Sequence, residues 1–186
     1  MEFTLERQIK LAKGWVKGDQ KAFSELYDHL ADKVYRYIYF KIKGSEVEDL
    51  VELTFLKAWE GRGSFDNDKS SFSTWIFTIA RNVVIDYYRS QKETIDLADV
   101  ADVIASDKLD SPKEATEKEL DKENLSVALQ QLDEPYREII VLRYLEDFAY
   151  EEIAEMLDKS EGSVRVLNFR GLKKLKQIMK DLDMIL

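Results

Sequence analysis

The sequence feature that most constrains the fold is a long apolar repeat of helical period near the start of the chain. Between residues 20 and 44, apolar side chains recur every three or four positions over more than five turns, at Phe23, Leu26, Tyr27, Leu30, Val34, Ile38 and Ile42. This spacing places them on one face of an α-helix. Only 2 prolines and 7 glycines interrupt the 186 residues, too few for the many tight turns of an all-β domain. We therefore predict an all-α fold.

Similar patterns predict helices along most of the remaining chain. Asp19 and Ser160 stand directly before two of them, where a short polar side chain caps the first free N–H groups. Ser45 and Glu48 have the spacing of a capping box. Pro135 suits the first turn of another helix. The predicted helices span residues 5–17, 20–44, 45–61, 72–91, 114–132, 135–145, 150–157 and 162–182.

An acidic segment separates two groups of these helices. Residues 93–124 hold 4 basic against 11 acidic side chains, a net charge of −7, and include Ser111-Pro112. A segment with this composition is typical of a linker. We therefore predict two helical domains, residues 1–92 and 125–186, joined by the acidic linker 93–124.

The composition excludes several classes of function. The chain has no cysteine and one histidine, which excludes disulfides and thiolate zinc sites and leaves little basis for a histidine-rich metal site or a Ser-His-Asp triad. No run of 18 apolar residues predicts a membrane span, and the acidic N-terminus does not resemble a signal peptide. We therefore expect a cytoplasmic protein that is not an enzyme and has no catalytic residue, no metal and no cofactor.

The C-terminal third has the pattern of a helix-turn-helix. Residues 150–157 form an acidic helix, 158–162 a turn, and the next helix lies in a stretch, 159–180, with 7 basic side chains against 1 acidic. A basic helix after an acidic one is the arrangement expected when the second enters the major groove of DNA. A plain helical hairpin with a solvated lysine-rich end is the alternative. The exposed side of the second helix is expected to carry Ser163, Arg165, Asn168, Phe169, Arg170 and Lys173.

The predicted helix 45–61 is apolar on every side. Its apolar residues include Leu50, Val51, Phe55, Leu56 and Trp59, whereas a surface helix normally shows one apolar stripe. The helix is therefore either a fully buried core helix or one with a second face meant for a partner. In the second case Asp49 and Glu52 supply charged contacts beside the apolar surface.

The predicted helix 72–91 has a polar face opposite its apolar stripe. Asn82, Asp86 and Arg89 share that face, and Lys69 lies in the polar loop 61–71 just before the helix. Asparagine and arginine hydrogen-bond to base edges, and a loop with Phe65 could receive an unpaired base. The alternative is an ordinary solvated face in which Asp86 pairs with Arg89.

These motifs together resemble a known family. Residues 22–27 (AFSELY), 34–37 (VYRY), 48–59 (EDLVELTFLKAW) and 72–89 (FSTWIFTIARNVVIDYYR) resemble domain 2 of bacterial extracytoplasmic-function (ECF) sigma factors. Residues 132–138 (LDEPYRE), 142–144 (LRY) and 150–175 resemble their domain 4. The likeness covers nearly the whole chain in order, with the linker between the two parts.

The resemblance implies a role for each surface. The 48–59 helix would grip the coiled coil of the polymerase β′ subunit through Asp49, Glu52, Phe55 and Leu56. The −10 promoter element would be melted and read by Lys69, Asn82, Asp86 and Arg89, with a flipped base held near the 61–71 loop. The −35 element would be contacted by Arg143, Ser163, Arg165, Val166, Phe169, Arg170 and Lys173.

The resemblance also implies partners and a geometry. The partners would be core RNA polymerase (its β′ and β subunits), promoter DNA and an anti-sigma factor, and the free chain would be a monomer. The 32-residue linker spans at most about 105 Å when extended. Promoter elements about 20–25 base pairs apart lie about 70–85 Å apart on B-DNA, which the linker can bridge.

Two other functions fit part of the sequence. A transcriptional regulator with a helical sensing domain and a helix-turn-helix would bind duplex DNA unaided and usually as a dimer. A helical adaptor would bind protein and no DNA. A sigma factor would select promoters only together with core polymerase, as a monomer.

Overall fold

The computed structural model describes residues 4–42, 45–97, 117–182 and 184. These residues form eight α-helices, one short 3-10 helix and one π-helical turn, and they contain no strand. The predicted all-α fold is therefore confirmed. The middle of the predicted acidic linker, residues 98–116, lies outside the described residues.

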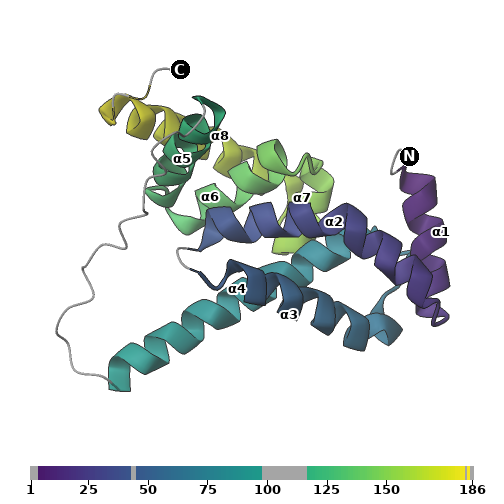
Figure 1. Cartoon of the computed structure of the whole chain (residues 1–186). Helices are drawn as coiled ribbons and strands as arrows, with labels where there is room; N and C mark the ends of the chain where they lie inside the picture. Colours follow the sequence, from purple (N-terminus) through teal and green to yellow (C-terminus); the bar gives the residue numbers. More distant parts are fainter. Residues whose placement is uncertain (1–3, 43–44, 98–116, 183, 185–186) are drawn as a thin grey trace.

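Four helices of the N-terminal half surround an aromatic core. They are α1 (Leu5–Val16), α2 (Gln20–Lys41), α3 (Val47–Glu60) and α4 (Phe72–Leu97), with the 3-10 helix η1 (Gly61–Ser64) between the last two (Figure 1). Asp19 caps α2 as predicted, because its carboxylate accepts hydrogen bonds from the backbone N–H groups of Lys21 and Ala22 at 2.9 and 3.2 Å. Trp15 is fully buried and packs against the rings of Phe23, Phe65, Phe72 and Trp75.

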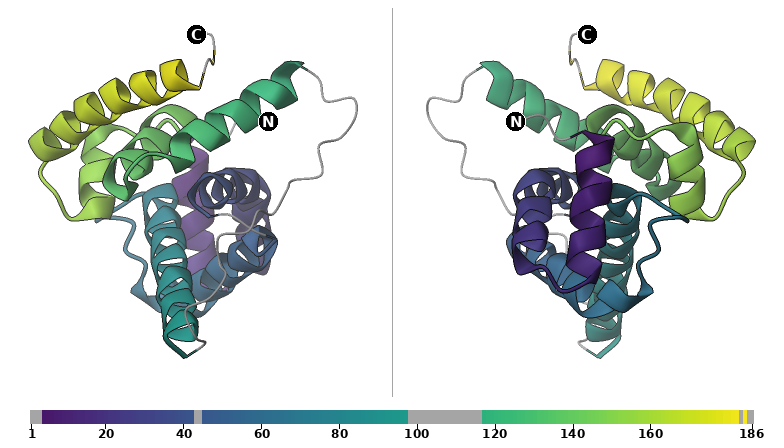
Figure 2. Two further views of the ribbon diagram at one scale, coloured as in Figure 1. Left: turned by 90° about the vertical axis from the view of Figure 1, so that its left-hand side faces the viewer. Right: turned by 90° about the vertical axis from the view of Figure 1, so that its right-hand side faces the viewer.

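The C-terminal half carries the second group of helices. They are α5 (Glu117–Gln130), α6 (Glu134–Ile140), the π-helical turn η2 (Val141–Leu145), α7 (Tyr150–Leu157) and α8 (Glu161–Asp181). The guanidinium of Arg137 donates to the carbonyl oxygens of Leu129, Gln130 and Leu132 at 2.9 Å each, which satisfies the free end of α5. The helix α8 lies across α6 and α7 on the side away from α2 (Figure 2).

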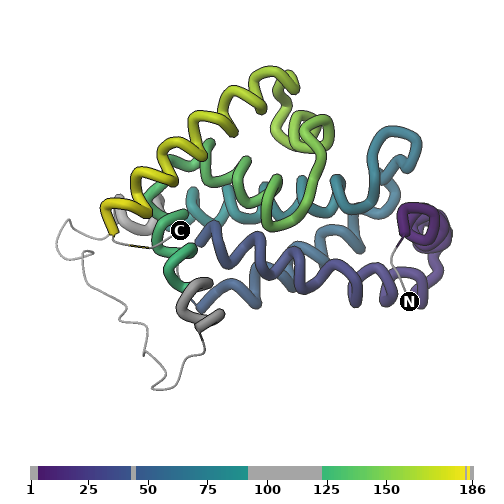
Figure 3. The backbone as a smooth tube through the Cα atoms, turned by 90° about the horizontal axis from the view of Figure 1, so that it is seen from above, coloured from purple at the N-terminus to yellow at the C-terminus, as the bar shows by residue number. Residues whose placement is uncertain are grey.

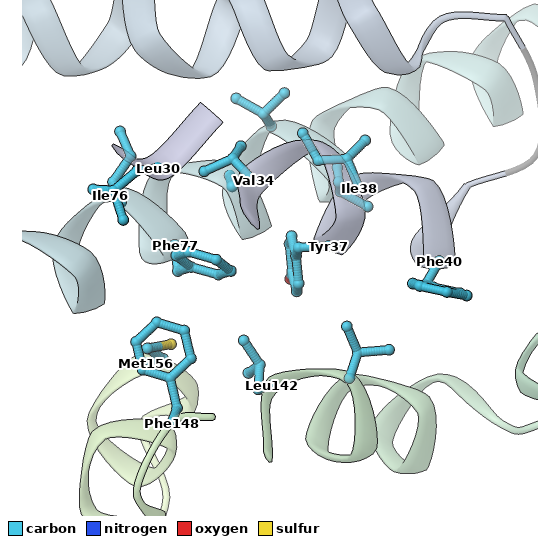
Figure 4. Packing of buried hydrophobic residues seen from close by; sticks show 14 of the residues in the cluster. Leu30, Val34, Tyr37, Ile38, Phe40, Ile76, Phe77, Leu142, Phe148 and Met156 are labelled. Carbon is cyan, nitrogen blue, oxygen red and sulfur yellow. The ribbon is translucent and has the colours of Figure 1, made fainter. Parts of the chain in front are cut away.

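The two halves pack directly against each other. The helices α2 and α4 contact α5, α7 and η2, as the view from above shows (Figure 3). Tyr37 and Phe77 point from the N-terminal half toward Leu142, Phe148 and Met156 of the C-terminal half (Figure 4). The rings of Phe77 and Phe148 meet edge to face, with centroids 4.7 Å apart.

Some helix ends differ from their predicted positions. The helix α3 begins at Val47 without a side-chain cap, so the capping box expected from Ser45 and Glu48 does not form. The helix α4 continues to Leu97, into the range predicted as linker, and α5 begins at Glu117, three residues after the predicted start of its helix. The extension of α4 was not predicted because residues 89–93 are all polar, and a prediction from apolar spacing ends where the apolar stripe ends.

Two glycines of α8 give a matched pair of stability predictions. A Cβ added at Gly171 would lie 3.1 Å from Cβ of Tyr136 and 3.2 Å from Cδ1 of Ile140, whereas one at Gly162 meets no atom of the described residues within 4 Å. We expect Gly162→Ala to raise the free energy of unfolding by about 0.5–1 kcal/mol through helix propensity. We expect Gly171→Ala to gain less or to lose stability, because α6 must shift. Urea unfolding measures both, and equal gains would contradict the close packing of α6 on α8.

Candidate nucleic-acid and partner-binding surfaces

The helix-turn-helix forms as predicted, with α7 and α8 joined by a tight turn. Asp158 takes a left-handed conformation (φ 51°), which an aspartate tolerates better than most residues. Ser160 caps α8, since its hydroxyl accepts from the backbone N–H of Ser163 at 3.2 Å. At the start of α7, Ala149 cannot cap, but the Glu152 carboxylate accepts from the Ala149 N–H at 2.8 Å. One half of a capping box therefore remains.

The outer face of α8 is basic and apolar at once. Phe169 is 71% exposed and Val166 49% exposed, and Ser163, Arg170 and Lys173 are exposed beside them. These are unusually large apolar side chains to leave in water on a helix whose other exposed residues, apart from Gly162 and Leu172, are polar. The face that the sequence assigned to DNA is therefore the face that the fold leaves open.

Tyr150 holds two of the predicted DNA-contacting arginines. The guanidinium of Arg165 lies 4.3 Å from the ring centre, and that of Arg143 lies 5.0 Å from it. Arg165 also donates to the Glu161 carboxylate at 2.6 Å, and Arg143 donates to the carbonyl oxygen of Phe148 at 2.9 Å. Both side chains are thus oriented before any ligand arrives.

Asn168 does not lie on the exposed side of α8, where the sequence analysis placed it. It is buried, and its side-chain amide donates to the hydroxyls of Tyr144 and Tyr150 at 3.0 and 2.9 Å. Its amide nitrogen is thus paired with hydroxyls from other elements, which a helical wheel cannot show, while its Oδ1 has no hydrogen-bond partner among the described residues. Asn168 therefore supports Tyr150 rather than contacting DNA.

The polar face of α4 is present as predicted. Asn82, Asp86 and Arg89 are all exposed. The Asp86 carboxylate lies 3.6 Å from the guanidinium of Arg89 and 3.9 Å from Nζ of Lys57 on α3. Exposed ion pairs at this range contribute little to stability, so the groups remain available for a ligand.

Phe65 anchors the loop 61–71 to the core. The sequence analysis expected this loop and its Phe65 to receive an unpaired base, and for Phe65 that prediction is wrong. Phe65 is buried and packs on Trp15, Phe72 and Trp75, so its ring is not available to an unpaired base. Lys69 in the same loop is highly exposed. Hydrogen bonding from the backbone of Asp68, followed by the contact with Lys69, lowers the pKa of Asp66.

A hollow of about 220 Å³ lies beside this loop. It is lined by Lys13, Val16, Lys17, Phe65, Asp66 and Asn67. Lys13 comes from α1 and Lys17 directly follows it, and sequence reasoning missed both because they lie about 50 residues from the loop in the chain. The hollow combines cations with hydrogen-bonding groups from Asp66 and Asn67.

The helix α3 is both a core helix and a surface helix. Val47, Leu50, Val51 and Ala58 are buried, while Asp49, Glu52, Leu53 and Leu56 are exposed. Phe55, predicted as a polymerase contact, is only 4% exposed, and its ring centre lies 4.5 Å from the ring centre of Tyr27. This prediction is corrected, because Phe55 belongs to the core of the N-terminal half.

A buried ionic cluster joins the two halves, and no sequence pattern predicted it. Tyr37 and Lys41 of α2 donate to the Glu138 carboxylate of α6 at 2.6 and 2.8 Å, and Lys41 also pairs with Glu134. Burial alone would raise the pKa of Glu138, but Lys41 and Tyr37 hold that pKa below its ordinary value. Burial and the neighbouring Glu138 carboxylate raise the pKa of Tyr37 well above its ordinary value.

Comparisons with known proteins place these surfaces in a family. The family described as Sigma-70 region 2 matches residues 26–94, and that described as Sigma-70, region 4 matches residues 122–175. The ECF RNA polymerase sigma factor SigW of Bacillus subtilis is 32% identical over 98% of this chain and 100% of its own length. The chain belongs to the ECF sigma factors of the sigma-70 family. BldN of Streptomyces coelicolor, also an ECF RNA polymerase sigma factor, is 31% identical over 94% of this sigma factor and 67% of its own length.

Solved structures agree with this assignment. CnrH, solved in complex with the cytosolic domain of CnrY, matches 94% of this sigma factor and 98% of its own chain, with a TM-score of 0.73 and 25% identity. The sigma factor RpoE of Bartonella quintana shares the fold over 86% of this chain and 98% of its own, with a TM-score of 0.73 and 23% identity.

Membership in this family defines the general function. This sigma factor is a transcription initiation factor with a DNA-binding helix-turn-helix, and the alternative of a regulator with a sensing domain is not favoured. Members of the family act as initiation factors rather than as enzymes. Among the described residues, no helix is long and apolar enough to cross a membrane. The same part of the chain contains no group of three or more His, Cys, Asp or Glu side chains that could hold a metal ion.

Proposed function

We propose that this sigma factor joins core RNA polymerase through α3 and reads its promoters with α4 and α8. On α3, the exposed set Asp49, Glu52, Leu53 and Leu56 mixes carboxylates with apolar side chains, which suits a docking surface for the β′ coiled coil. One observation supports the proposal above all. The surfaces of α3, α4 and α8, which were predicted from separate parts of the sequence, are all exposed to solvent in the folded chain.

The −10 element meets α4 and the loop before it. Asn82, Asp86 and Arg89 offer donors and acceptors for base edges, and Lys69 offers a cation for a phosphate. The hollow beside the loop adds Lys13 and the polar side chain of Asn67. Unpairing a base costs a few kcal/mol, which these polar contacts offset when they hold the flipped base.

The −35 element meets the outer face of α8 in the major groove. Arg165, Arg170 and Lys173 pair with phosphates or base edges, while Val166 and Phe169 fit the methyl groups of thymine. Ser163 lies in the first turn of the helix, where backbone N–H groups favour a phosphate, and Arg143 reaches a neighbouring phosphate.

The partners of the free sigma factor follow from the same proposal. In the cytoplasm it is a monomer that binds the β′ and β subunits of core polymerase and uses no cofactor. An anti-sigma factor competes with polymerase for it. The similar structure of CnrH was solved with the cytosolic domain of another protein bound, which supports a protein partner of this kind.

One experiment tests the proposed function as a whole. The purified chain is added to core RNA polymerase with a genomic DNA library, and the transcript starts are sequenced. We expect a set of starts that share two upstream sequence elements and that are absent without the chain. Starts that are the same with and without the chain would contradict the proposal, as would specific DNA binding by the chain alone as a dimer.

The contribution of α8 to phosphate contact predicts a change in salt dependence. Removing one phosphate contact lowers the slope of log affinity against log salt by about 1. We therefore expect Arg170→Ala to reduce the slope measured for the polymerase complex on a promoter fragment by about this amount. Lys180→Ala is the matched control, because Lys180 lies near the far end of the same helix. Equal slopes for Arg170→Ala and the unmodified chain would remove Arg170 from the DNA interface.

A further inference from the structure

One buried side chain of α8 makes polar contacts that the helix itself does not need. Asn168 is 5% exposed, and its amide nitrogen donates to the hydroxyls of Tyr144 in η2 and Tyr150 in α7 at 3.0 and 2.9 Å. The other polar atom of this amide, Oδ1, is buried without a hydrogen-bond partner in the part of the chain that the structure describes. A buried acceptor that is left unpaired destabilises the folded state.

Packing alone does not account for an asparagine at position 168. Leucine has the same branched shape and would bring no unpaired acceptor into the site. Tyr144 is exposed and Tyr150 half-buried, so water can replace the amide as the partner of their hydroxyls. Exchanging a buried polar group for an apolar one of the same shape is then close to neutral or stabilising. The amide therefore has a use in what the two tyrosines hold.

Tyr150 connects the amide to two arginines. The guanidinium of Arg165 lies 4.3 Å from the centre of the Tyr150 ring, and that of Arg143 lies 5.0 Å from it. Attraction to the ring electrons favours these positions over the ring face. Asn168 bonds to the hydroxyl at the far end of the same ring, so it fixes the surface on which both charges rest. A phenylalanine in place of Tyr150 would keep the ring and lose this bond.

The two arginines differ in which of their N–H groups are already used. Arg143 is half-buried, and its Nη1 donates to the carbonyl oxygen of Phe148 at 2.9 Å. The side chain of Arg165 is 54% exposed, and Glu161 accepts from its Nε at 2.6 Å and also from its Nη2. These bonds occupy one side edge of the Arg165 guanidinium. Its end edge, with one N–H of Nη1 and one of Nη2, has no acceptor among the residues that the structure describes.

The end edge of a guanidinium is suited to reading guanine. Its two parallel N–H groups match the O6 and N7 acceptors of guanine in the major groove, and such a pair discriminates against other bases about 5- to 150-fold. This pairing needs the guanidinium in the plane of the base, whereas attraction to a phosphate depends mainly on charge. A guanidinium that is held in place before binding also loses less entropy when the pair forms. The orientation of Arg165 therefore matters for selectivity more than for overall attraction to DNA.

We propose that Asn168 is a positioning residue for promoter discrimination, which acts through Tyr150 to hold the end edge of Arg165 for one guanine of the −35 element. This inference rests on the proposed function, which places the outer face of α8 in the major groove. It extends that function from a surface that meets DNA to the arrangement that selects one base pair. The fold keeps the unpaired Oδ1 because promoter selection, rather than stability, depends on the amide.

The first test measures the mobility of Arg165 in the free chain by NMR spectroscopy. A guanidinium held over an aromatic ring shows ring-shifted side-chain protons and slow exchange of its Nε–H with water. We expect Asn168→Leu and Tyr150→Phe each to reduce the ring shift and to speed the exchange about 5-fold, the effect of losing one hydrogen bond. Tyr144→Phe removes the other hydroxyl from the same amide, and no described Arg or Lys lies over its ring, so it should change neither.

Urea unfolding separates positioning from damage to the fold. We expect Asn168→Leu to leave the unfolding midpoint unchanged or to raise it, because the variant removes the unpaired Oδ1. Tyr150→Phe carries the same test if the leucine variant does not fold, since it keeps the ring and removes one oxygen atom.

The second test measures base discrimination by the complex with core polymerase. A promoter found from the transcript starts is randomised in its −35 element, and the bound and unbound DNA is sequenced. Arg165→Ala should lose the preference for guanine at one base pair, which identifies the pair that Arg165 reads. We expect Asn168→Leu and Tyr150→Phe to lower the same preference about 5-fold and to change preferences at other positions by less than about 2-fold. Tyr144→Phe should change none of them.

A double variant tests whether Asn168 acts through Arg165. In that case Asn168→Leu combined with Arg165→Ala loses no more discrimination than Arg165→Ala alone. The slope of log affinity against log salt should be the same for Asn168→Leu and the unmodified chain, because no phosphate contact is removed. Additive losses, or an equal loss at every position of the element, would overturn the proposal. So would a guanine preference that survives Arg165→Ala at every base pair.

The outcomes separate this inference from the proposed function. Unchanged Arg165 signals in both Asn168→Leu and Tyr150→Phe would overturn the positioning role, whatever the DNA measurements show. If the unmodified chain gives no promoter-specific binding with core polymerase, the proposed function fails instead. In that case the spectra of the free chain still decide whether Asn168 fixes Arg165, because they need neither polymerase nor DNA.

Discussion

Leu56→Asp is expected to weaken binding to core RNA polymerase by at least about 30-fold while leaving the fold intact. Leu56 is 53% exposed on α3, one helical turn after Glu52 and Leu53 and two turns after Asp49. Truncating a central apolar anchor of a protein interface typically costs 2 kcal/mol or more, which corresponds to about 30-fold. An aspartate at the same place adds the cost of burying an unpaired charge. The dissociation constant is measured by titrating labelled sigma factor with core polymerase.

A matched control keeps this prediction specific. Leu5→Asp makes the same chemical change at an exposed leucine of α1, and we expect it to leave polymerase binding unchanged. Both variants should unfold within about 0.5 kcal/mol of the unmodified chain, since both positions are exposed. Normal polymerase binding by Leu56→Asp would show that α3 is not the docking surface.

The neighbouring Phe55 cannot serve as a second test of docking. The sequence analysis assigned it to the polymerase contact, but its ring is buried against Tyr27. Phe55→Ala removes core packing, which typically costs about 3–5 kcal/mol of stability. Any loss of polymerase binding in that variant would follow from damage to the fold, so it carries no information about the interface.

The features that the sequence predicted correctly are local ones. The caps at Asp19 and Ser160 depend on bonds to residues two or three positions away. The apolar stripe of α2 and the turn between α7 and α8 likewise need only short-range spacing. Each of these features depends only on residues within one or two turns of helix. Contacts between distant parts of the chain therefore do not change them.

The misplaced residues share a different cause. Phe55, Phe65 and Asn168 each stand where a helix or loop has more than one face that could be buried, and only the neighbouring elements decide which face is covered. For Asn168 the deciding partners are the hydroxyls of Tyr144 and Tyr150, 24 and 18 residues away. Residue type alone misleads in such places, because a polar side chain whose donors are paired is tolerated in a core.

The contact between the halves lay beyond sequence reasoning altogether. Arg36 and Lys41 look like solvated charges on an amphipathic helix, and their partners are about a hundred positions away. Charged residues are almost never fully buried unless they are paired, and the pairing exists only in the folded chain. The sequence therefore predicted two domains and a linker, but not that the domains close on each other.

Trp15→Ala is expected to lower the free energy of unfolding of the N-terminal half by about 3–5 kcal/mol, the usual cost of truncating a large buried aromatic residue. Trp15 is fully buried, with ring centres of Phe72 and Phe23 at 5.2 and 5.6 Å. Urea unfolding followed by tryptophan fluorescence measures the loss, because the remaining tryptophans, Trp59 and Trp75, both lie in this half.

Trp15→Phe separates packing from hydrogen bonding at the same site. The indole N–H of Trp15 is buried and has no acceptor among the described residues, so a phenylalanine removes an unsatisfied donor and leaves a smaller cavity. We expect it to cost less than half as much as alanine. Phe65 anchors the loop 61–71 against Trp15, so Trp15→Ala should also impair opening of the −10 element more than Trp15→Phe does. Equal effects of the two variants on stability and on promoter opening would show that the aromatic cluster does not position the loop.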